Sequence, residues 1–236
     1  MLQAFTRLVR SFKEGGALYT ANRLYIALRN RIADRLGYWA WRDAKIDRDV
    51  ETMDLTKISS LLDPNAMRGL NALVTEDPTL AAKILDRADK ILARDFAVLG
   101  YDLPKEGPWP WATDWTCGYV WPKVSTSKID LYESREQPYD IKRPFELSRL
   151  FFLPQVALAA GLSDGPQRER YFGFLEDTLQ DWLRENPTNG SVAWYSFEAS
   201  VRTVFVFQTL ALLQAVDGPT PVIRLLLKIA LRCQHF

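Results

Sequence analysis

The sequence predicts an all-α fold of stacked, antiparallel helical hairpins. Two observations support this prediction. Apolar residues recur at helical spacing over most of the chain, and proline-containing turns divide these stretches into segments joined by short connections. With 236 residues, 47% of them apolar, the chain is long enough to bury one sizeable core. Consecutive helices joined by short turns pack as antiparallel neighbours. One long aromatic-rich loop is the exception to the helical pattern.

Residues 1–48 form a basic segment for which we predict a helix. The segment carries ten Lys or Arg residues and four acids. Its apolar residues recur every three or four positions, at Ala21, Tyr25, Leu28, Ile32, Leu36 and Trp39. The basic face could contact an acidic polymer or membrane phosphates. Because a solvated face on a packed helix is the commoner arrangement, we expect the apolar stripe to be buried.

Two further helices should begin at proline-containing signals. Asp63-Pro64 and Asp77-Pro78 each combine an N-cap residue with a proline at the first helical position. A short helix is expected after the first signal. After the second, a helix should run to about Arg94, with a stripe made of Leu80, Ile84, Ala88, Ile91 and Leu92.

The stretch from Gly100 to Pro144 predicts a long loop. Six prolines interrupt it, and only Tyr119–Trp121 and Lys128–Tyr132 resemble short strands. The loop is rich in aromatic residues, namely Trp109, Trp111, Trp115, Tyr119 and Trp121. Flat aromatic faces beside a carboxylate are how proteins commonly receive sugar rings. Anchoring of the loop onto the helices is an equally good interpretation.

Four helices are expected after the loop. The first holds Leu147, Leu150, Phe151, Val156 and Leu158 in one segment, and the second runs through Tyr171 and Trp182 to a stop at Asn186-Pro187. The third, from about Trp194 to Ala215, is apolar nearly all round and should be an inner helix. The last starts at Pro221 and is expected to be still helical at Phe236, with His235 on it.

Composition excludes several classes of function. The 30 basic and 29 acidic side chains lack the basic excess of a dedicated nucleic-acid binder. Two cysteines and one histidine are too few for a disulfide-stapled scaffold or a multi-cysteine zinc site, so no metal and no cofactor are expected. No signal peptide is evident, and the longest charge-free apolar stretch, Thr203–Val216, is too short for a transmembrane helix. The sequence leaves the compartment undetermined.

Two groups of charged residues could carry chemistry. Glu146 and Arg149 are three residues apart at a helix start, which places them on one face. Trp194, Glu198 and Arg202 step by four along the apolar helix, where a carboxylate and a guanidinium need to be paired. On spacing alone, structural ion pairs are the favoured interpretation of both groups.

Three motifs resemble the N-terminal helical domain of the heparinase II/III family of polysaccharide lyases. They are Asp140-x-Lys142-x-x-Phe145-Glu146-x-x-Arg149, Trp182-Leu-x-x-Asn186-Pro187 and Val192-Ala193-Trp194-x-x-x-Glu198-x-x-x-Arg202. The resemblance implies an incomplete (α/α) toroid over residues 49–236, truncated at its C-terminus, whose cleft binds an acidic, uronic-acid-containing polysaccharide. The candidate substrate-binding residues, chosen for charge, hydrogen bonding or ring stacking, are Trp115, Lys142, Arg149, Trp194, Tyr195, Glu198 and Arg202.

Such lyases cleave by β-elimination, in which a base removes a proton, a neighbouring group neutralises the uronate carboxylate and an acid protonates the leaving oxygen. The family usually places an asparagine or histidine just before the tryptophan of the third motif, where this chain has Ala193. A later family motif with a tyrosine and a histidine would fall beyond Phe236, and His235 does not match it. Two alternatives remain: a non-catalytic polysaccharide-binding module, and a toroid hydrolase that uses Asp114 and Glu198 as acid and base.

Overall fold

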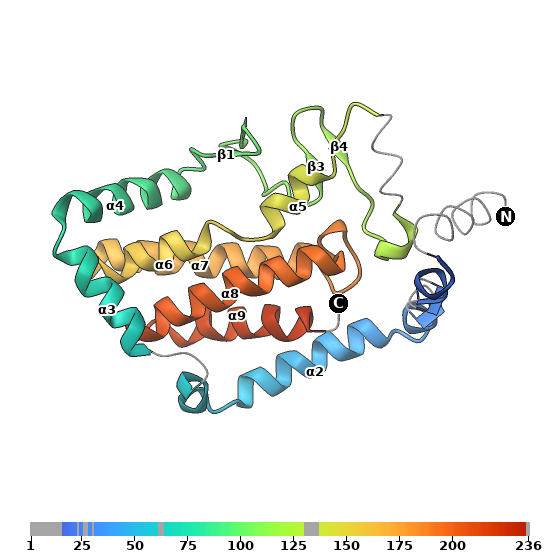
Figure 1. Ribbon diagram of the computed structural model, residues 1–236, viewed down its shortest axis with the longest axis horizontal. Helices are drawn as coiled ribbons and strands as arrows, with labels where there is room; N and C mark the ends of the chain where they lie inside the picture. Colours follow the sequence, from blue (N-terminus) through green and yellow to red (C-terminus); the bar gives the residue numbers. More distant parts are fainter. Residues whose placement is uncertain are drawn as a thin grey trace.

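Four adjacent helices form the body of the molecule in the computed structural model, which describes residues 16–22, 24–25, 28–29, 31–60, 64–129 and 137–234 (Figure 1). They are α6 (Leu153–Gly161), α7 (Gly165–Glu185), α8 (Ser196–Ala215) and α9 (Thr220–Cys233). Helix α6 packs against α7 and α8, and α9 packs against α7 and α8. Helix α4 (Pro78–Leu92) contacts α6 on one side, and α2 (Tyr38–Thr52) contacts α9 on the other. The predicted all-α class is confirmed.

The core lies between these helices and consists of aliphatic and aromatic side chains. Every inner helix contributes residues with no solvent exposure, among them Leu153, Val156, Leu175, Leu179, Leu210, Leu213, Leu226 and Ile229. Burying each such side chain contributes about 2 kcal/mol relative to leaving it in water. This core fixes the positions of the helix ends at which the motif residues lie.

Both predicted helix starts after the N-terminal segment are confirmed. A 3₁₀ helix over Leu55–Ser60 precedes α3 (Pro64–Thr75), and α4 begins at Pro78. The Asp77 side chain accepts hydrogen bonds from the amides of Thr79 and Leu80, as an N-cap should. Helix α4 ends at Leu92, two residues before the expected end, and Arg94 adopts a left-handed conformation with φ 54°.

The helix expected through Leu147 and Leu158 is instead two helices, so the single-segment prediction is wrong. Helix α5 covers Lys142–Ser148, and α6 begins at Leu153. Between them Leu150 has a left-handed φ of 62°. Pro154 explains the break, because a proline has no amide hydrogen for the carbonyl four residues earlier and its ring clashes with that carbonyl. The corner places Arg149 at the end of α5.

Two very short antiparallel hairpins lie at the start of the long loop and within it. Strand β1 (Ala97–Val98) pairs with β2 (Tyr101–Asp102), and β3 (Thr113–Asp114) pairs with β4 (Tyr119–Val120). The strand predicted at Tyr119–Trp121 is therefore present in shortened form. Lys128 instead ends a 3₁₀ turn that begins at Thr126, and the rest of the second predicted strand, residues 130–132, lies outside the described residues.

Two tryptophans anchor this loop to the helices. The Trp109 ring stacks on Trp111 with centroids 5.0 Å apart and on Phe152 with centroids 5.5 Å apart. Trp111 is 2% exposed, and its indole N–H donates to Asp181 of α7 over 2.7 Å. For these two residues, packing rather than sugar stacking explains the aromatic cluster.

The N-terminal segment does not bury its stripe, which corrects the sequence prediction. The described residues between 16 and 35 are helical, but a turn at Leu36-Gly37 separates them from α2. Tyr25, Leu28 and Ile32 are at least 50% exposed, whereas Trp39, after the turn, is 8% exposed. Gly37 has φ 63°, a conformation that suits glycine and redirects the chain. Only the part after Gly37 therefore faces α9.

Two predictions about the last helices also need correction. Helix α8 is not covered all round, because Phe197 is 67% exposed and Val204 is 54% exposed on one open face. Helix α9 ends at Cys233, and His235 lies outside the described residues. Across the described ranges, no helix is both long and apolar enough to cross a bilayer.

The N-cap of α4 gives a first testable prediction. Replacing Asp77 with Ala removes two hydrogen bonds to helix amides and should lower the free energy of unfolding by about 1 kcal/mol. Asp164, the N-cap of α7, makes no side-chain capping bond. Asp164→Ala is therefore the matched control and should change the stability by less than about 0.5 kcal/mol. Urea titration measures both, and equal effects would contradict the assigned role of Asp77.

Candidate functional site

The three motifs, separated in the sequence, meet at one place in the structure. Trp182 of α7 packs edge-to-face against Trp194, with ring centroids 5.5 Å apart. Trp194 lies in a 3₁₀ helix (Val192–Trp194) just before α8, and its indole N–H donates to the Asn186 carbonyl over 3.1 Å. Arg149, from the end of α5, reaches Glu198 in the first turn of α8. The first, second and third motifs thus form one cluster.

Arg202 lies at the centre of this cluster and has no solvent exposure. Its Nε donates to the carbonyl of Ser148 and one Nη to the carbonyl of Ala193, each over 2.6 Å. The other Nη contacts the sulfur of Cys233 in α9 at 3.6 Å. Its guanidinium carbon lies 4.5 Å from the Trp182 ring centroid. One side chain of α8 is therefore bonded to the end of α5, the 3₁₀ helix and α9.

The partner of Arg202 differs from the sequence prediction. Glu198 and Arg202 were expected to pair along α8, but the Glu198 carboxylate takes two hydrogen bonds from Arg149 instead. Burial lowers the pKa of Arg202, since the charged guanidinium is taken out of water. Backbone carbonyls and indole faces compensate for the lost hydration. The role of Arg202 is to hold the fold together.

Arg149 connects the buried part of the cluster to the protein surface. Its Nε donates to Glu198 over 2.6 Å, and it also pairs with Glu146, as the three-residue spacing predicted. The hydrogen bonds to Glu198 raise the pKa of Arg149. The side chain is 21% exposed, so part of the guanidinium remains open to a ligand. Its charge is, however, largely neutralised by the two carboxylates.

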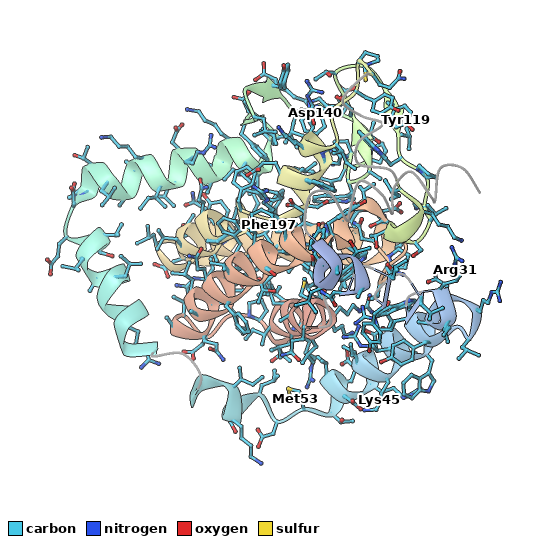
Figure 2. The ribbon with its side chains drawn as sticks, turned by 45° about the vertical axis from the view of Figure 1, so that its right-hand side comes forward. Arg31, Lys45, Met53, Tyr119, Asp140 and Phe197 are labelled. Carbon is cyan, nitrogen blue, oxygen red and sulfur yellow. The ribbon has the colours of Figure 1, made fainter. Side chains whose placement is uncertain are left out.

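Besides Glu146 and Arg149, three residues of α5 and of the start of α8 reach the surface. Phe197 is 67% exposed and points out of the first turn of α8, and the Arg149 guanidinium carbon lies 5.6 Å from its ring centroid (Figure 2). Lys142, at the start of α5, is exposed. Tyr195 is partly buried, and its hydroxyl donates to the carbonyls of Thr126 and Ile129. We define Lys142, Glu146, Arg149, Tyr195 and Phe197 as the α5–α8 face.

Sequence reasoning missed Phe197 as a surface residue. It lies in a stretch whose residues are apolar nearly all round, which predicts burial. The polar neighbours Ser196 and Ser200 indicate that one side of the helix is open. Both serines are exposed. An aromatic ring between two exposed hydroxyl side chains is typical of a contact surface rather than of a core.

Several predicted site residues lie where a polymer cannot touch them. Trp194 and Ala193 have no exposure, and the Ala193 carbonyl is occupied by Arg202. Together with Arg202, these residues belong to the interior in this structure. Trp115 is partly buried and packs against the main core, and its indole N–H has no hydrogen-bond partner within the described part of the chain. The position at which the family usually carries a neutralising residue is therefore internal here.

Asp114, one half of the proposed hydrolase pair, is fully buried and already bonded. It pairs with Arg143, and it accepts from the Asp140 amide over 2.7 Å and from the Thr116 amide and hydroxyl. Burial by itself raises the pKa of Asp114, but these hydrogen bonds and the charge of Arg143 outweigh it and lower the pKa. A general acid needs a raised pKa. Asp114 instead fixes the β3–β4 hairpin to the start of α5.

Among the described residues, no group of three or more His, Cys, Asp or Glu side chains is placed to hold a metal ion. Cys233 is buried beside Arg202, and Cys117 is exposed in the loop. What the arrangement offers is a partly neutralised guanidinium, an exposed lysine and an exposed aromatic ring on one face. These groups suit binding of a polar or anionic ligand more than proton transfer.

Removing the Arg202 guanidinium should destabilise the protein strongly. Arg202→Met leaves two buried carbonyls without donors, so we expect a loss of about 3 kcal/mol in the free energy of unfolding. The matched control is Arg184→Met, since Arg184 is 67% exposed and makes only surface ion pairs, worth about 1 kcal/mol or less. Denaturant unfolding followed by tryptophan fluorescence measures the difference. Equal losses in both variants would contradict the assigned role.

The Asp114 cluster predicts a pH-dependent stability. Because its pKa in the folded state is lowered, Asp114 stabilises the fold at neutral pH and loses that contribution as the pH falls below its ordinary value of 3.8. Asp114→Asn should cost about 3 kcal/mol at neutral pH, with a smaller difference from the wild type in acid. Exposed Glu169→Gln serves as the control. A pH-independent difference would contradict the assignment.

Comparison with known proteins does not identify this site. No family model, curated protein or solved structure matches the chain. The resemblance to the heparinase II/III family therefore rests on the three motifs alone. The evidence on function comes from the exposed side chains of the α5–α8 face.

Proposed function

We propose that this chain is the substrate-binding helical part of a heparinase II/III-type lyase, acting on a uronic-acid-containing polysaccharide by β-elimination. In this proposal the helices belong to an (α/α) toroid of antiparallel hairpins, of which α6–α7 and α8–α9 are two. The polymer lies on the α5–α8 face. One observation carries the proposal: the three resembling motifs, spread over 63 residues between Asp140 and Arg202, come together in one cluster that ends in this face.

The chemistry of the face suits an acidic sugar. Phe197 offers an exposed ring for the apolar side of a pyranose, and Lys142 offers an exposed ammonium group. The Arg149 guanidinium can donate hydrogen bonds to carboxylate or sulfate oxygens, and its ion pairs with Glu146 and Glu198 hold it in place. A uronate bound here would have its carboxylate partly neutralised, which is what β-elimination requires of the binding domain.

A non-catalytic polysaccharide-binding module is the second candidate, and one observation favours it. At the place of the family's neutralising residue, Ala193 is buried and its carbonyl is bonded to Arg202. Introducing Asn there would bury an unpaired amide and destabilise the fold, so the effect of that substitution on activity could not be separated from its effect on stability. The hydrolase alternative is less well supported, because Asp114 and Glu198 are both held in ion pairs and neither is poised as an acid.

Binding is tested first, by isothermal titration with alginate and heparan sulfate. Lys142→Glu should weaken binding about fivefold, since it reverses one exposed charge on the face. Lys83→Glu makes the same change on an exposed residue of α4 and should leave the affinity unchanged. No binding by the wild type, or equal effects of both variants, would contradict the proposed face.

The reaction is tested with the same polymers. β-Elimination leaves an unsaturated uronate, so a lyase raises the ultraviolet absorbance of the mixture. Binding without any absorbance change would favour the non-catalytic module. Release of reducing ends without absorbance would assign a hydrolase, and an absence of both binding and products would refute the proposal.

A further inference from the structure

An apolar stripe remains open to solvent on the N-terminal segment, away from the α5–α8 face. Its side chains follow the helical spacing that the sequence predicted, with one further member seven residues before Tyr25. The members are Leu18, Tyr25, Leu28, Ile32 and Leu36, which are 85, 64, 59, 50 and 77% exposed. Exposed apolar side chains gathered at helical spacing mark an interaction site.

Two aromatic residues that follow the turn at Gly37 are also exposed. Trp41 is 57% exposed and Tyr38 is 38% exposed at the start of α2, with ring centroids 5.9 Å apart. Trp and Tyr are enriched at the boundary between membrane and water, because each combines an apolar ring with a polar group. The stripe is therefore followed in the chain by exposed side chains typical of an interfacial anchor.

Charge on this segment is concentrated and basic. Residues 1–48 hold ten basic and four acidic side chains, whereas the remainder of the chain holds 20 basic and 25 acidic. Arg31 and Arg35 are exposed beside the stripe, and Figure 2 places Arg31 at the outer edge of the molecule. An exposed apolar stripe flanked by arginines is the pattern of a helix that lies in the headgroup plane of an anionic bilayer.

Polar contacts join this segment to the helical body and leave the stripe outside. Asn189 donates to the Asp34 carboxylate over 3.1 Å, and the Thr188 amide donates to Asp43 over 3.1 Å. Ala33, next to Asp34, is 9% exposed. The body thus holds the segment by the side that carries Ala33 and Asp34, while the apolar side faces solvent.

We propose that the N-terminal segment binds an anionic lipid surface, with the stripe inserted at the boundary between headgroups and acyl chains. A second copy of the chain is a poorer occupant, because two basic segments would repel each other. An acidic polysaccharide would neutralise the arginines but would leave the aliphatic side chains in water. This inference uses no residue of the α5–α8 face and does not depend on the proposed lyase function.

Vesicle co-sedimentation of the full chain tests the proposal. We expect binding to phosphatidylcholine vesicles that contain phosphatidylglycerol, and much weaker binding to phosphatidylcholine alone. Raising the salt concentration about tenfold should weaken the binding, because the arginine contribution is screened. Binding that is equal on both vesicle types would overturn the anionic assignment.

The double variant Leu28→Ser/Ile32→Ser removes two apolar side chains from the centre of the stripe. It should lower the vesicle partition coefficient at least about tenfold. Leu73→Ser is the control, because Leu73 is 67% exposed on α3, outside the segment. Since all three leucine or isoleucine residues are at least half exposed, circular dichroism should show both proteins folded.

Three results would overturn the proposal. The first is vesicle binding by Leu28→Ser/Ile32→Ser that equals the wild type. The second is a lipid-free dimer, seen by light scattering, that the double variant dissociates, which would assign the stripe to a second copy. The third is loss of alginate binding in the double variant with vesicle binding unchanged, which would assign the segment to the polymer.

Discussion

The buried guanidinium of Arg202 is the interaction on which the rest of the cluster depends. A guanidinium without solvent exposure is tolerable only where hydrogen-bond acceptors and π faces replace its hydration. Here the carbonyls of Ser148 and Ala193 and the rings of Trp182 and Trp194 do so. These four partners come from three segments, so satisfying one side chain requires α5, α7 and the 3₁₀ helix to be in place at once.

Charge pairing decides what the candidate site can do. Arg149 is shared between Glu146 and Glu198, and Asp114 is held by Arg143 and by three hydrogen bonds from the Asp140 amide and Thr116. These pairs position the surface of the α5–α8 face and engage all three of these carboxylates with arginines. The groups of this face that stay open to a ligand are partly exposed cations and an aromatic ring, which suit recognition of an anionic or polar ligand.

The N-terminal segment differs from the helical body in that its apolar face is exposed. Its helical period was readable from the sequence, and the period predicted which side chains share a face. Whether that face is covered depends on another part of the chain. The turn at Gly37 directs Trp39 and Ile46 of α2 toward α9, so no described helix covers the preceding stripe. The same pattern that predicts a core helix therefore describes an exposed amphipathic one.

The sequence alone determined the helical class, the Asp77-Pro78 start and the stop at Asn186-Pro187, because propensity, capping and proline geometry act over a few residues. It also predicted that Glu146 and Arg149 would pair. Only the tertiary structure decided that Glu198 bonds to Arg149, 49 residues away, and that Arg202 bonds to carbonyls. Such choices depend on which distant groups packing brings within about 3 Å, and helical spacing carries no information about them.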